Sequence, residues 1–193
     1  MDAAELGTPP EGMRLLLSGL WMARACLAVL FATALWHKAR APREFVEAVG
    51  QYRLLPTSLV AAGAIGVGLA ETVVLAGLLS LPLSPAPFAW GAAGLLAAYG
   101  LAIAINLGRG RDTIDCGCHG FSGRQRIAGW MVLRNLLLAT VAALLALTTQ
   151  RGDSLPMPAQ ADWLGIGGAT IVLCLLYGAV HHLAANAARL ARR

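Results

Sequence analysis

Five long apolar blocks, separated by shorter polar segments, dominate the chain. Each block is about 20 residues or longer, which is the length that a helix needs to cross a hydrocarbon core about 30 Å thick. Because backbone polar groups in lipid must hydrogen-bond within their own segment, each block is predicted to be a helix. The blocks cover residues 15–36, 57–81, 88–107, 128–148 and 163–183. The pattern therefore predicts an all-α membrane protein, a bundle of about five transmembrane helices.

The same pattern predicts one domain with a tail at each end. Residues 1–13 are polar and are expected to form a flexible tail, and residues 188–193 form a basic tail. The first apolar block could be a cleaved signal peptide with Ala32-Thr33-Ala34 at its cleavage site. The length of the block and the presence of Arg24 favour a retained helix instead. Residues 14–187 are thus predicted to be a single transmembrane domain.

The polar segments are predicted to fall alternately on two faces of the bundle. Segments 38–56 and 108–127 share one face with the C-terminal tail, and together they carry eleven Lys and Arg residues. The opposite face has only Arg14 and Arg151 outside the spans. By the positive-inside rule, this asymmetry places the first face in the cytoplasm.

Segment 38–56 is predicted to contain a short helix that lies at the membrane surface. Apolar side chains recur there at helical spacing, which is typical of a helix with one face in the lipid headgroups. These side chains are Phe45, Val46, Val49 and Tyr52. A proline cannot continue a helix, so Pro56 is expected to end it.

Composition strengthens the membrane assignment and argues against a nucleic-acid partner. Of the 193 residues, 58% are hydrophobic and 13% are charged, whereas soluble domains average about 25% charged residues. The net charge of +5 comes from basic residues that lie between the apolar blocks. No soluble domain carries a basic face of the kind that binds nucleic acid. The lipid bilayer is therefore an expected partner, and nucleic acid is not.

Three charged residues lie inside predicted spans. Arg24 and Glu71 each lie roughly 20 Å from the same face, counting 1.5 Å per residue. An unpaired charge at this depth costs at least ~2.5–3.5 kcal/mol, so an Arg24–Glu71 ion pair is predicted, either as a clamp or as part of a proton relay or cofactor contact. Arg134 lies about two turns into the fourth span. It could reach the surface or raise the thiolate fraction of nearby cysteines.

Cys116-Gly117-Cys118, in the polar segment before the fourth block, is the strongest candidate for chemistry. Gly117 allows the bent backbone that brings two thiols this close in sequence into disulfide range. A disulfide in so small a ring is expected to be strained, and therefore oxidising and easily exchanged. At the membrane surface such a dithiol could exchange electrons with a thioredoxin-like partner, and these electrons could pass to or from a quinone.

Two other interpretations of this segment stay open. Cys116, Cys118 and His119 supply three of the four ligands of a tetrahedral zinc site, and copper(I) would need fewer. A fourth ligand could come from the histidines predicted near the same face: His37, His181 and His182. Alternatively the thiols are unpaired and the protein is a non-catalytic membrane scaffold. Cys26 and Cys174 lie deep in spans and are expected to act as small apolar side chains.

Several of these residues together resemble a known family. The spacing Arg24-x6-Phe31-x6-Lys38, the run Phe45-x6-Tyr52-Arg-Leu-Leu-Pro56 and the acidic Glu71 are similar to the DoxX-type small membrane proteins. Asp115-Cys-Gly-Cys-His-Gly120, with Arg134-Asn135 in the next span, narrows the resemblance to the methylamine-utilisation MauE branch. The resemblance covers the first four spans, so the expected fold is a four-helix core plus a C-terminal span. This architecture is similar in outline to the vitamin K epoxide reductase bundle.

The resemblance implies a redox-associated protein of the bacterial inner membrane. MauE is linked to maturation of methylamine dehydrogenase, whose small subunit is rich in disulfides, beside a thioredoxin-fold protein. The resemblance implies that Cys116 and Cys118 are the redox pair. It also implies supporting residues of unknown role: Arg24, Lys38, Glu71 and Arg134. His119 stands where the family pattern has an aromatic residue such as Phe, which keeps the metal interpretation open.

Charge and resemblance disagree on the side of the membrane that the dithiol faces. The distribution of Lys and Arg predicts the cytoplasm, where a dithiol would suit reductant import with electrons drawn from thioredoxin. Disulfide formation belongs outside the cytoplasm. The resemblance favours the external face, and this is the orientation that we expect.

Overall fold

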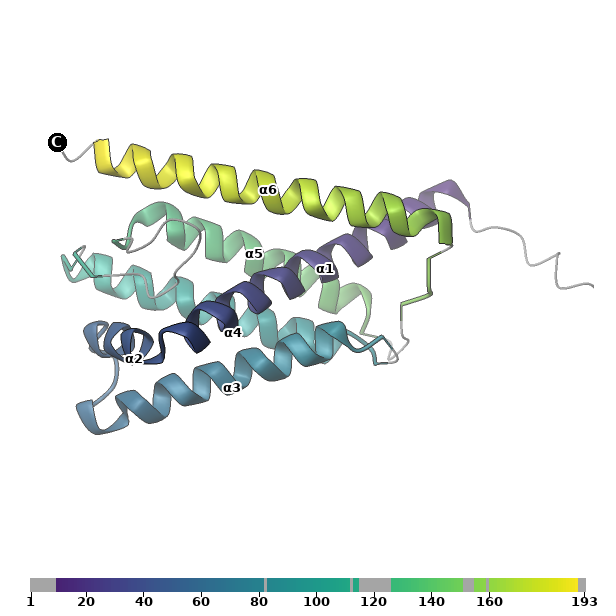
Figure 1. The fold of residues 1–193 in the computed structure, drawn as a ribbon. Helices are drawn as coiled ribbons and strands as arrows, with labels where there is room; N and C mark the ends of the chain where they lie inside the picture. The colour runs from purple at the N-terminus through teal and green to yellow at the C-terminus, as the bar shows by residue number, and fades with distance from the viewer. Residues whose placement is uncertain are drawn as a thin grey trace, which may run out of the picture.

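The computed structural model of the chain describes residues 10–81, 83–111, 113–114, 126–150, 155–158 and 160–190. These residues form six α-helices, with a 3₁₀ turn η1 (Thr57–Leu59) before the third (Figure 1). The α-helices are α1 (Glu11–Arg40), α2 (Pro42–Gln51), α3 (Val60–Leu79), α4 (Ala86–Gly108), α5 (Gly129–Thr148) and α6 (Gln160–Leu190). Five of these, all except the short α2, are long and apolar enough to cross a membrane. The predicted all-α bundle with five membrane spans is confirmed.

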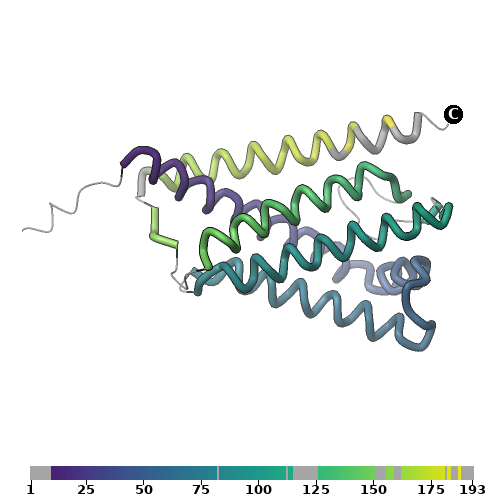
Figure 2. The backbone as a smooth tube through the Cα atoms, turned by 180° about the vertical axis from the view of Figure 1, so that it is seen from behind, coloured from purple at the N-terminus to yellow at the C-terminus, as the bar shows by residue number. Residues whose placement is uncertain are grey.

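The long helices run alternately up and down the bundle. Figures 1 and 2 show α1, α4 and α6 running in one direction and α3 and α5 in the other. The short α2 lies at one end, together with the starts of α3 and α5 and the ends of α4 and α6. We call this the α2 end. The described residues next to the two basic segments and the C-terminal tail therefore lie at the same end of the molecule, as the alternation of polar segments predicts.

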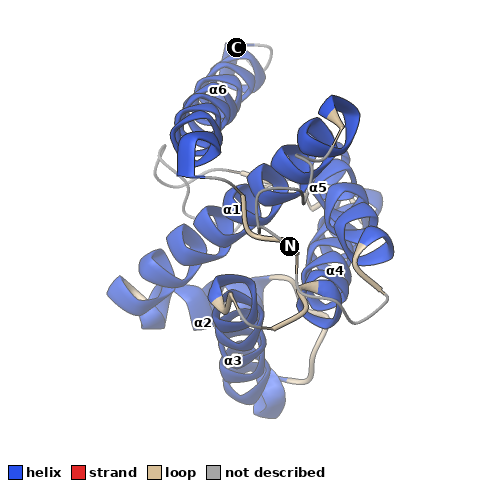
Figure 3. Cartoon of the chain, turned by 90° about the vertical axis from the view of Figure 1, so that its right-hand side faces the viewer, coloured by secondary structure: helices blue, strands red, loops and turns tan. Residues whose placement is uncertain are grey.

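Seen along its axis, the bundle places α1 between the other spans (Figure 3). On one side α4 and α5 pack along each other, and α3 packs against both α1 and α4. The α6 helix lies apart from this group and packs against α1. Near the start of α6, the rings of Trp21 and Trp163 meet edge to face with centroids 5.3 Å apart. Trp21 Nε1 donates to the backbone oxygen of Pro156 at 3.0 Å, which ties the segment before α6 to α1.

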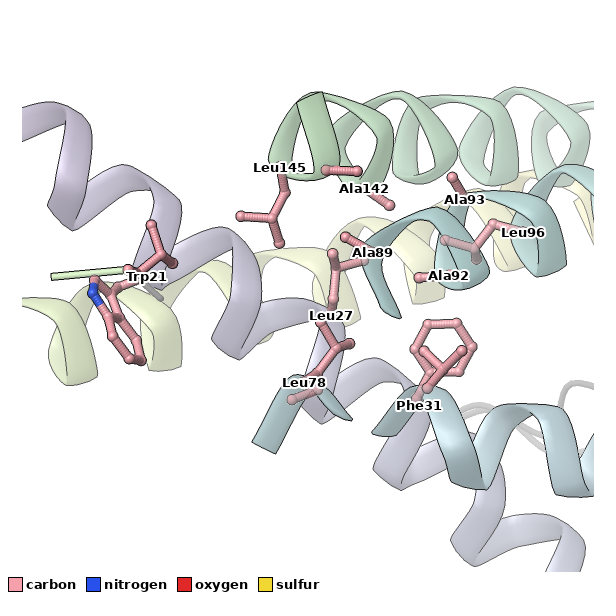
Figure 4. Packing of buried hydrophobic residues seen from close by; sticks show 14 of the residues in the cluster. Trp21, Leu27, Phe31, Leu78, Ala89, Ala92, Ala93, Leu96, Ala142 and Leu145 are labelled. Atoms are coloured by element: carbon pink, nitrogen blue, oxygen red, sulfur yellow. The ribbon is translucent and has the colours of Figure 1, made fainter. Parts of the chain in front are cut away.

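The core combines alanines on α4 with large side chains from its neighbours (Figure 4). Ala89 and Ala92 are fully buried, and their small size lets the neighbouring helices approach closely. Leu27 and Phe31 from α1 and Leu145 from α5 fill the space between the helices. Large apolar side chains also point outward along every span, which suits a surface solvated by lipid rather than water.

Helix ends differ from the predicted apolar blocks. α1 begins inside the predicted tail and runs four residues past the predicted end at position 36, and α6 continues to Leu190. Basic residues and alanines are good helix formers, so hydrogen bonding continues beyond the apolar stretch. The predicted end of the surface helix at Pro56 is wrong. α2 ends at Gln51, and Arg53 adopts a φ of 47°, a left-handed conformation that cannot continue a helix.

Candidate functional site

A cavity of about 320 Å³ opens near the α2 end, between α1, α2, α3 and α4. We call it the α2 pocket. Its walls are apolar, with Val49 from α2, Leu95 and Ile103 from α4 and Leu55 from the turn before α3. Its lining also includes Lys38, the one charged residue there, and several aromatic side chains: Phe45, Tyr52 and Tyr99. The pocket is therefore an apolar chamber with one polar wall.

Lys38 and Tyr99, at the polar wall, both bind the buried carboxylate of Glu71. Lys38 Nζ lies 2.5 Å from Oε1 and 2.6 Å from Oε2 of Glu71, and Tyr99 donates its hydroxyl to Oε1 at 2.6 Å. The Glu71 side chain is 0% exposed and the Lys38 side chain is 11% exposed. A buried charge is tolerated only when it is paired and hydrogen-bonded, and here one carboxylate receives three hydrogen bonds. We call these three residues the ionic triad.

The predicted Arg24–Glu71 ion pair is wrong. Arg24 instead donates from Nε to the backbone oxygen of Leu78 at 2.7 Å and from Nη2 to that of Ser80 at 2.5 Å. These carbonyls belong to the last turn of α3 and the residue after it, which lack helical partners. The guanidinium thus caps α3, where a cation also opposes the negative end of the helix dipole. It lies 5.0 Å from the ring centroid of Trp21.

The geometry of α1 explains why Glu71 pairs with Lys38 and not with Arg24. Arg24, Phe31 and Lys38 recur every seven residues, so they share the face of α1 that packs on α3. A rise of about 1.5 Å per residue gives only the level of each Cα along the helix, and the apolar pattern places Lys38 outside the first span. The helix in fact extends to Arg40, and helical side chains point back towards the N-terminus. Lys38 therefore reaches into the bundle and meets Glu71.

Cys116, Cys118 and His119 lie outside the described residues, so the predicted redox pair and the predicted metal ligands both fall there. The residues that flank this segment are described. Ile127 donates its backbone N–H to the oxygen of Ile114 at 3.0 Å, so the two ends of the segment are joined. These two isoleucines are buried together with Ile103 and Met131. We call this four-residue cluster the loop base.

The loop base and the α2 pocket share a wall. Ile103 belongs to the loop base and also lines the pocket. Tyr52, just after α2, packs against the loop base and lines the pocket as well. The described residues on either side of the cysteine segment, Ile114 and Ile127, therefore belong to a cluster that adjoins the apolar chamber.

Polar side chains of α4 and α5 lie within about one turn of the loop-base residues Ile103 and Met131 along these helices. Asn106 and Asn135 are buried, and each donates its amide to the backbone oxygen four residues earlier. The guanidinium of Arg134 lies 5.5 Å from the ring centroid of Trp130, about one and a half turns into α5. The effect of Arg134 on the thiolate fraction of the cysteines stays a prediction.

Other residues predicted for metal binding are not brought together within the described part of the chain. No three His, Cys, Asp or Glu side chains are grouped there closely enough to hold a metal ion. The side chain of His181 lies outside the description. Cys26 and Cys174 are half-buried thiols on α1 and α6, without a disulfide.

Comparison with known proteins settles the family. Residues 16–148 match the family model of methylamine utilisation protein MauE. The chain belongs to the MauE family. No solved structure matches the chain.

Individual MauE proteins support this assignment. The chain is 37% identical over 158 residues to methylamine utilization protein MauE of Paracoccus denitrificans, covering 81% of this chain and 83% of that protein. It is 38% identical over 160 residues to MauE of Methylorubrum extorquens, with 81% and 82% covered. It is 46% identical over 122 residues to MauE of Paracoccus versutus, with 63% and 65% covered.

The MauE match extends from α1 to the end of α5. It therefore includes the ionic triad, the α2 pocket, the loop base and the Cys-Gly-Cys motif, whereas α6 lies outside it. This agrees with the expected four-helix core plus a C-terminal span.

Sequence reasoning missed Tyr99 and Asn106. Both are polar residues inside an apolar block, and that position was a usable signal, because a polar group in a span needs a partner. Phe45 and Tyr52 were assigned to the lipid surface, yet both also line the α2 pocket. Their helical spacing could indicate a buried face as well as a lipid-facing one.

Proposed function

We propose that this chain is a membrane thiol–disulfide redox protein of methylamine utilisation, which exchanges electrons through Cys116 and Cys118 with a thioredoxin-fold partner. The proposal places it in the bacterial inner membrane with the dithiol on the external face. Its physiological role would be to support disulfide formation in the small subunit of methylamine dehydrogenase, acting through that partner.

The observation that carries the proposal is the closure of the segment that holds the Cys-Gly-Cys motif at its two described ends. The motif lies in a segment whose ends are joined by the Ile127–Ile114 backbone hydrogen bond above a buried apolar cluster. Ile114 and Ile127 lie between the end of α4 and the start of α5, at the α2 end of the bundle. The proposal is that a soluble partner meets the cysteines at this end. Family membership supports the biological setting, since the relatives carry the name methylamine utilization protein.

The chemistry needs only the two thiols and a partner disulfide or dithiol. In the oxidising direction, a partner thiolate attacks one sulfur of the Cys116–Cys118 disulfide and displaces the other as a thiolate. The second partner thiol then attacks the mixed disulfide, so that two electrons pass to the membrane protein and a disulfide forms on the partner. Arg111 and Arg126 flank the segment, and positive charge there favours the thiolate form of either cysteine.

Trapping of the mixed disulfide tests the proposal. Cys116→Ser and Cys118→Ser are made separately in a chain with Cys26→Ala and Cys174→Ala, so that each variant retains one thiol. We expect at least one of them to accumulate a covalent adduct with a thioredoxin-fold protein, released by reductant, because the resolving thiol is missing. The matched control is Cys26→Ser in the natural chain, which should behave as the unaltered protein.

Two outcomes would contradict the proposal. If neither single-thiol variant forms a reducible adduct, Cys116 and Cys118 do not exchange with a partner. If the purified protein instead carries stoichiometric zinc or copper that is lost on His119→Ala, the segment is a metal site.

A further inference from the structure

We propose that the α2 pocket binds a membrane quinone. The inference deepens the proposed function, on which it rests for the identity of the electron donor, because it names the class of molecule that exchanges electrons with the dithiol inside the membrane. Binding itself is argued from the pocket.

The walls of the pocket exclude a strongly polar ligand. Apart from Lys38, the lining consists of aliphatic and aromatic side chains from α2, α3, α4 and the turn between α2 and α3. Its volume of about 320 Å³ lies in the range of small-molecule sites, which begins at about 300 Å³. A flat ring with the first part of an apolar tail matches both this size and this chemistry.

The ionic triad selects the head group. The ion pair of Lys38 and Glu71 is neutral as a unit, so it gives no preference for an anionic lipid. An ammonium carries three N–H donors, and the carboxylate of Glu71 accepts two of them. The remaining N–H can donate to an uncharged oxygen such as a quinone carbonyl. An acyl chain has no such oxygen at its end.

Aromatic side chains surround the same polar wall. Lys38 Nζ lies 4.9 Å from the ring centroid of Phe45 and 5.7 Å from that of Tyr99. A ligand that accepts a hydrogen bond from Lys38 therefore lies beside these rings. Offset or edge contacts between aromatic rings favour a planar guest over a flexible chain.

The pocket has an exit for an isoprenoid tail. Leu54 and Leu55 line it and are each 41% exposed, and Ala98 on α4 lines it with an exposed side chain. These positions belong to the apolar surface that faces the lipid. A quinone could thus place its head beside Lys38 while its tail stays in the bilayer.

The location relates the pocket to the dithiol. Both Ile103, which belongs to the loop base, and Tyr52, which packs against it, line the pocket. The loop base includes Ile114 and Ile127, which flank the cysteine segment in the sequence. The reaction balances without another reactant. Two thiols give up two electrons and two protons to form the Cys116–Cys118 disulfide, and the quinone takes them up on its two carbonyl oxygens to become a hydroquinone. The reverse reaction balances equally.

Photolabelling tests the site. The full chain is purified, placed in phosphatidylcholine vesicles and illuminated with an azido derivative of a short-chain ubiquinone, and labelled peptides are mapped by mass spectrometry. We expect labels on α2 and α4, and loss of labelling when unmodified ubiquinone-1 is added in excess. Labelling that ubiquinone-1 does not displace would overturn the proposal and indicate a lipid site.

A matched pair of variants places the site in the pocket. Ala98→Phe adds a ring to the pocket lining, and Ala97→Phe adds the same ring at the neighbouring exposed position, which does not line the pocket. Ala98→Phe should lower labelling about tenfold, the loss expected from about 1.4 kcal/mol of binding free energy. Ala97→Phe should leave it unchanged. Equal labelling of the two variants would contradict the assignment.

The same experiment separates this proposal from the redox function. A chain with Cys116→Ser and Cys118→Ser should still be labelled, since the pocket does not require the thiols. If the pocket is labelled but no partner adduct can be trapped, the redox function fails and the quinone site stands. If adducts form but the pocket takes no label, the quinone site fails and the redox function stands.

Discussion

Glu71 is the residue around which the polar interior of the bundle is built. Its carboxylate is inaccessible, lies 11 residues into a 20-residue span and accepts hydrogen bonds from Lys38 and Tyr99. In lipid a carboxylate without partners is expensive, so Lys38 and Glu71 are expected to depend on each other. Their pairing also orients the ammonium that faces the α2 pocket.

Removal of the ammonium should therefore destabilise the protein. Lys38→Met leaves Glu71 buried without its cation, and we expect the free energy of unfolding to fall by about 3–5 kcal/mol. Adding Glu71→Gln should recover most of the loss, because the uncharged amide no longer needs a cation. Titration of the purified protein with sodium dodecyl sulfate in mixed micelles measures both changes.

The control for this prediction is Arg43→Met, which removes an exposed basic side chain from α2. Its effect should stay within about 0.5 kcal/mol, as is usual for surface substitutions. If Lys38→Met lowers the free energy of unfolding by no more than Arg43→Met does, the ion pair does not stabilise the buried Glu71.

At the scale of elements, one face of α1 organises α3. Arg24 caps the end of α3, Phe31 fills the middle of the contact, and Lys38 pairs with Glu71. The two cations therefore contact α3 at separate points, and Lys38 takes the carboxylate that was predicted to pair with Arg24. The coupling between pairs of substitutions therefore distinguishes the observed Lys38–Glu71 ion pair from the predicted Arg24–Glu71 ion pair.

Double-mutant cycles should show coupling for one pair and not for the other. Arg24→Met and Glu71→Gln should change the free energy of unfolding additively, within about 0.5 kcal/mol, because the side chains do not touch. Lys38→Met and Glu71→Gln should be coupled by more than about 1 kcal/mol. Strong coupling between Arg24 and Glu71 would indicate the predicted Arg24–Glu71 ion pair and contradict the observed geometry.

The sequence predicts the elements of this protein better than their contacts. Apolar length identifies every span, since lipid imposes the same requirement on each. It does not specify which side of α1 meets α3, how far Lys38 reaches, or that α2 lines a pocket with Phe45 and Tyr52. These features depend on crossing angles and side-chain direction, which a count of residues along one helix cannot supply. The cysteine motif is different, because its chemistry is local and can be recognised from three residues.

At the scale of the whole molecule, the chain consists of a four-span core with a fifth span attached to its side. The core carries every feature assigned here to function, and it coincides with the region that matches the MauE family. α6 is joined to α1 through Trp21 and Trp163 and through an Arg14–Asp162 ion pair of 3.0 Å. Within the core, the loop base and the α2 pocket share Ile103, and Tyr52 contacts both. This juxtaposition supports the proposed transfer of electrons between a soluble partner and a quinone in the membrane.

The central claim is that Cys116 and Cys118 form a reversible disulfide that faces outward. Labelling of these two thiols in intact cells with a membrane-impermeant maleimide tests it directly, in a chain with Cys26→Ala and Cys174→Ala so that no other thiol can react. The account predicts little labelling before reduction and full labelling of both cysteines after brief treatment with an impermeant reductant. Equal labelling of both thiols before and after reduction would contradict it.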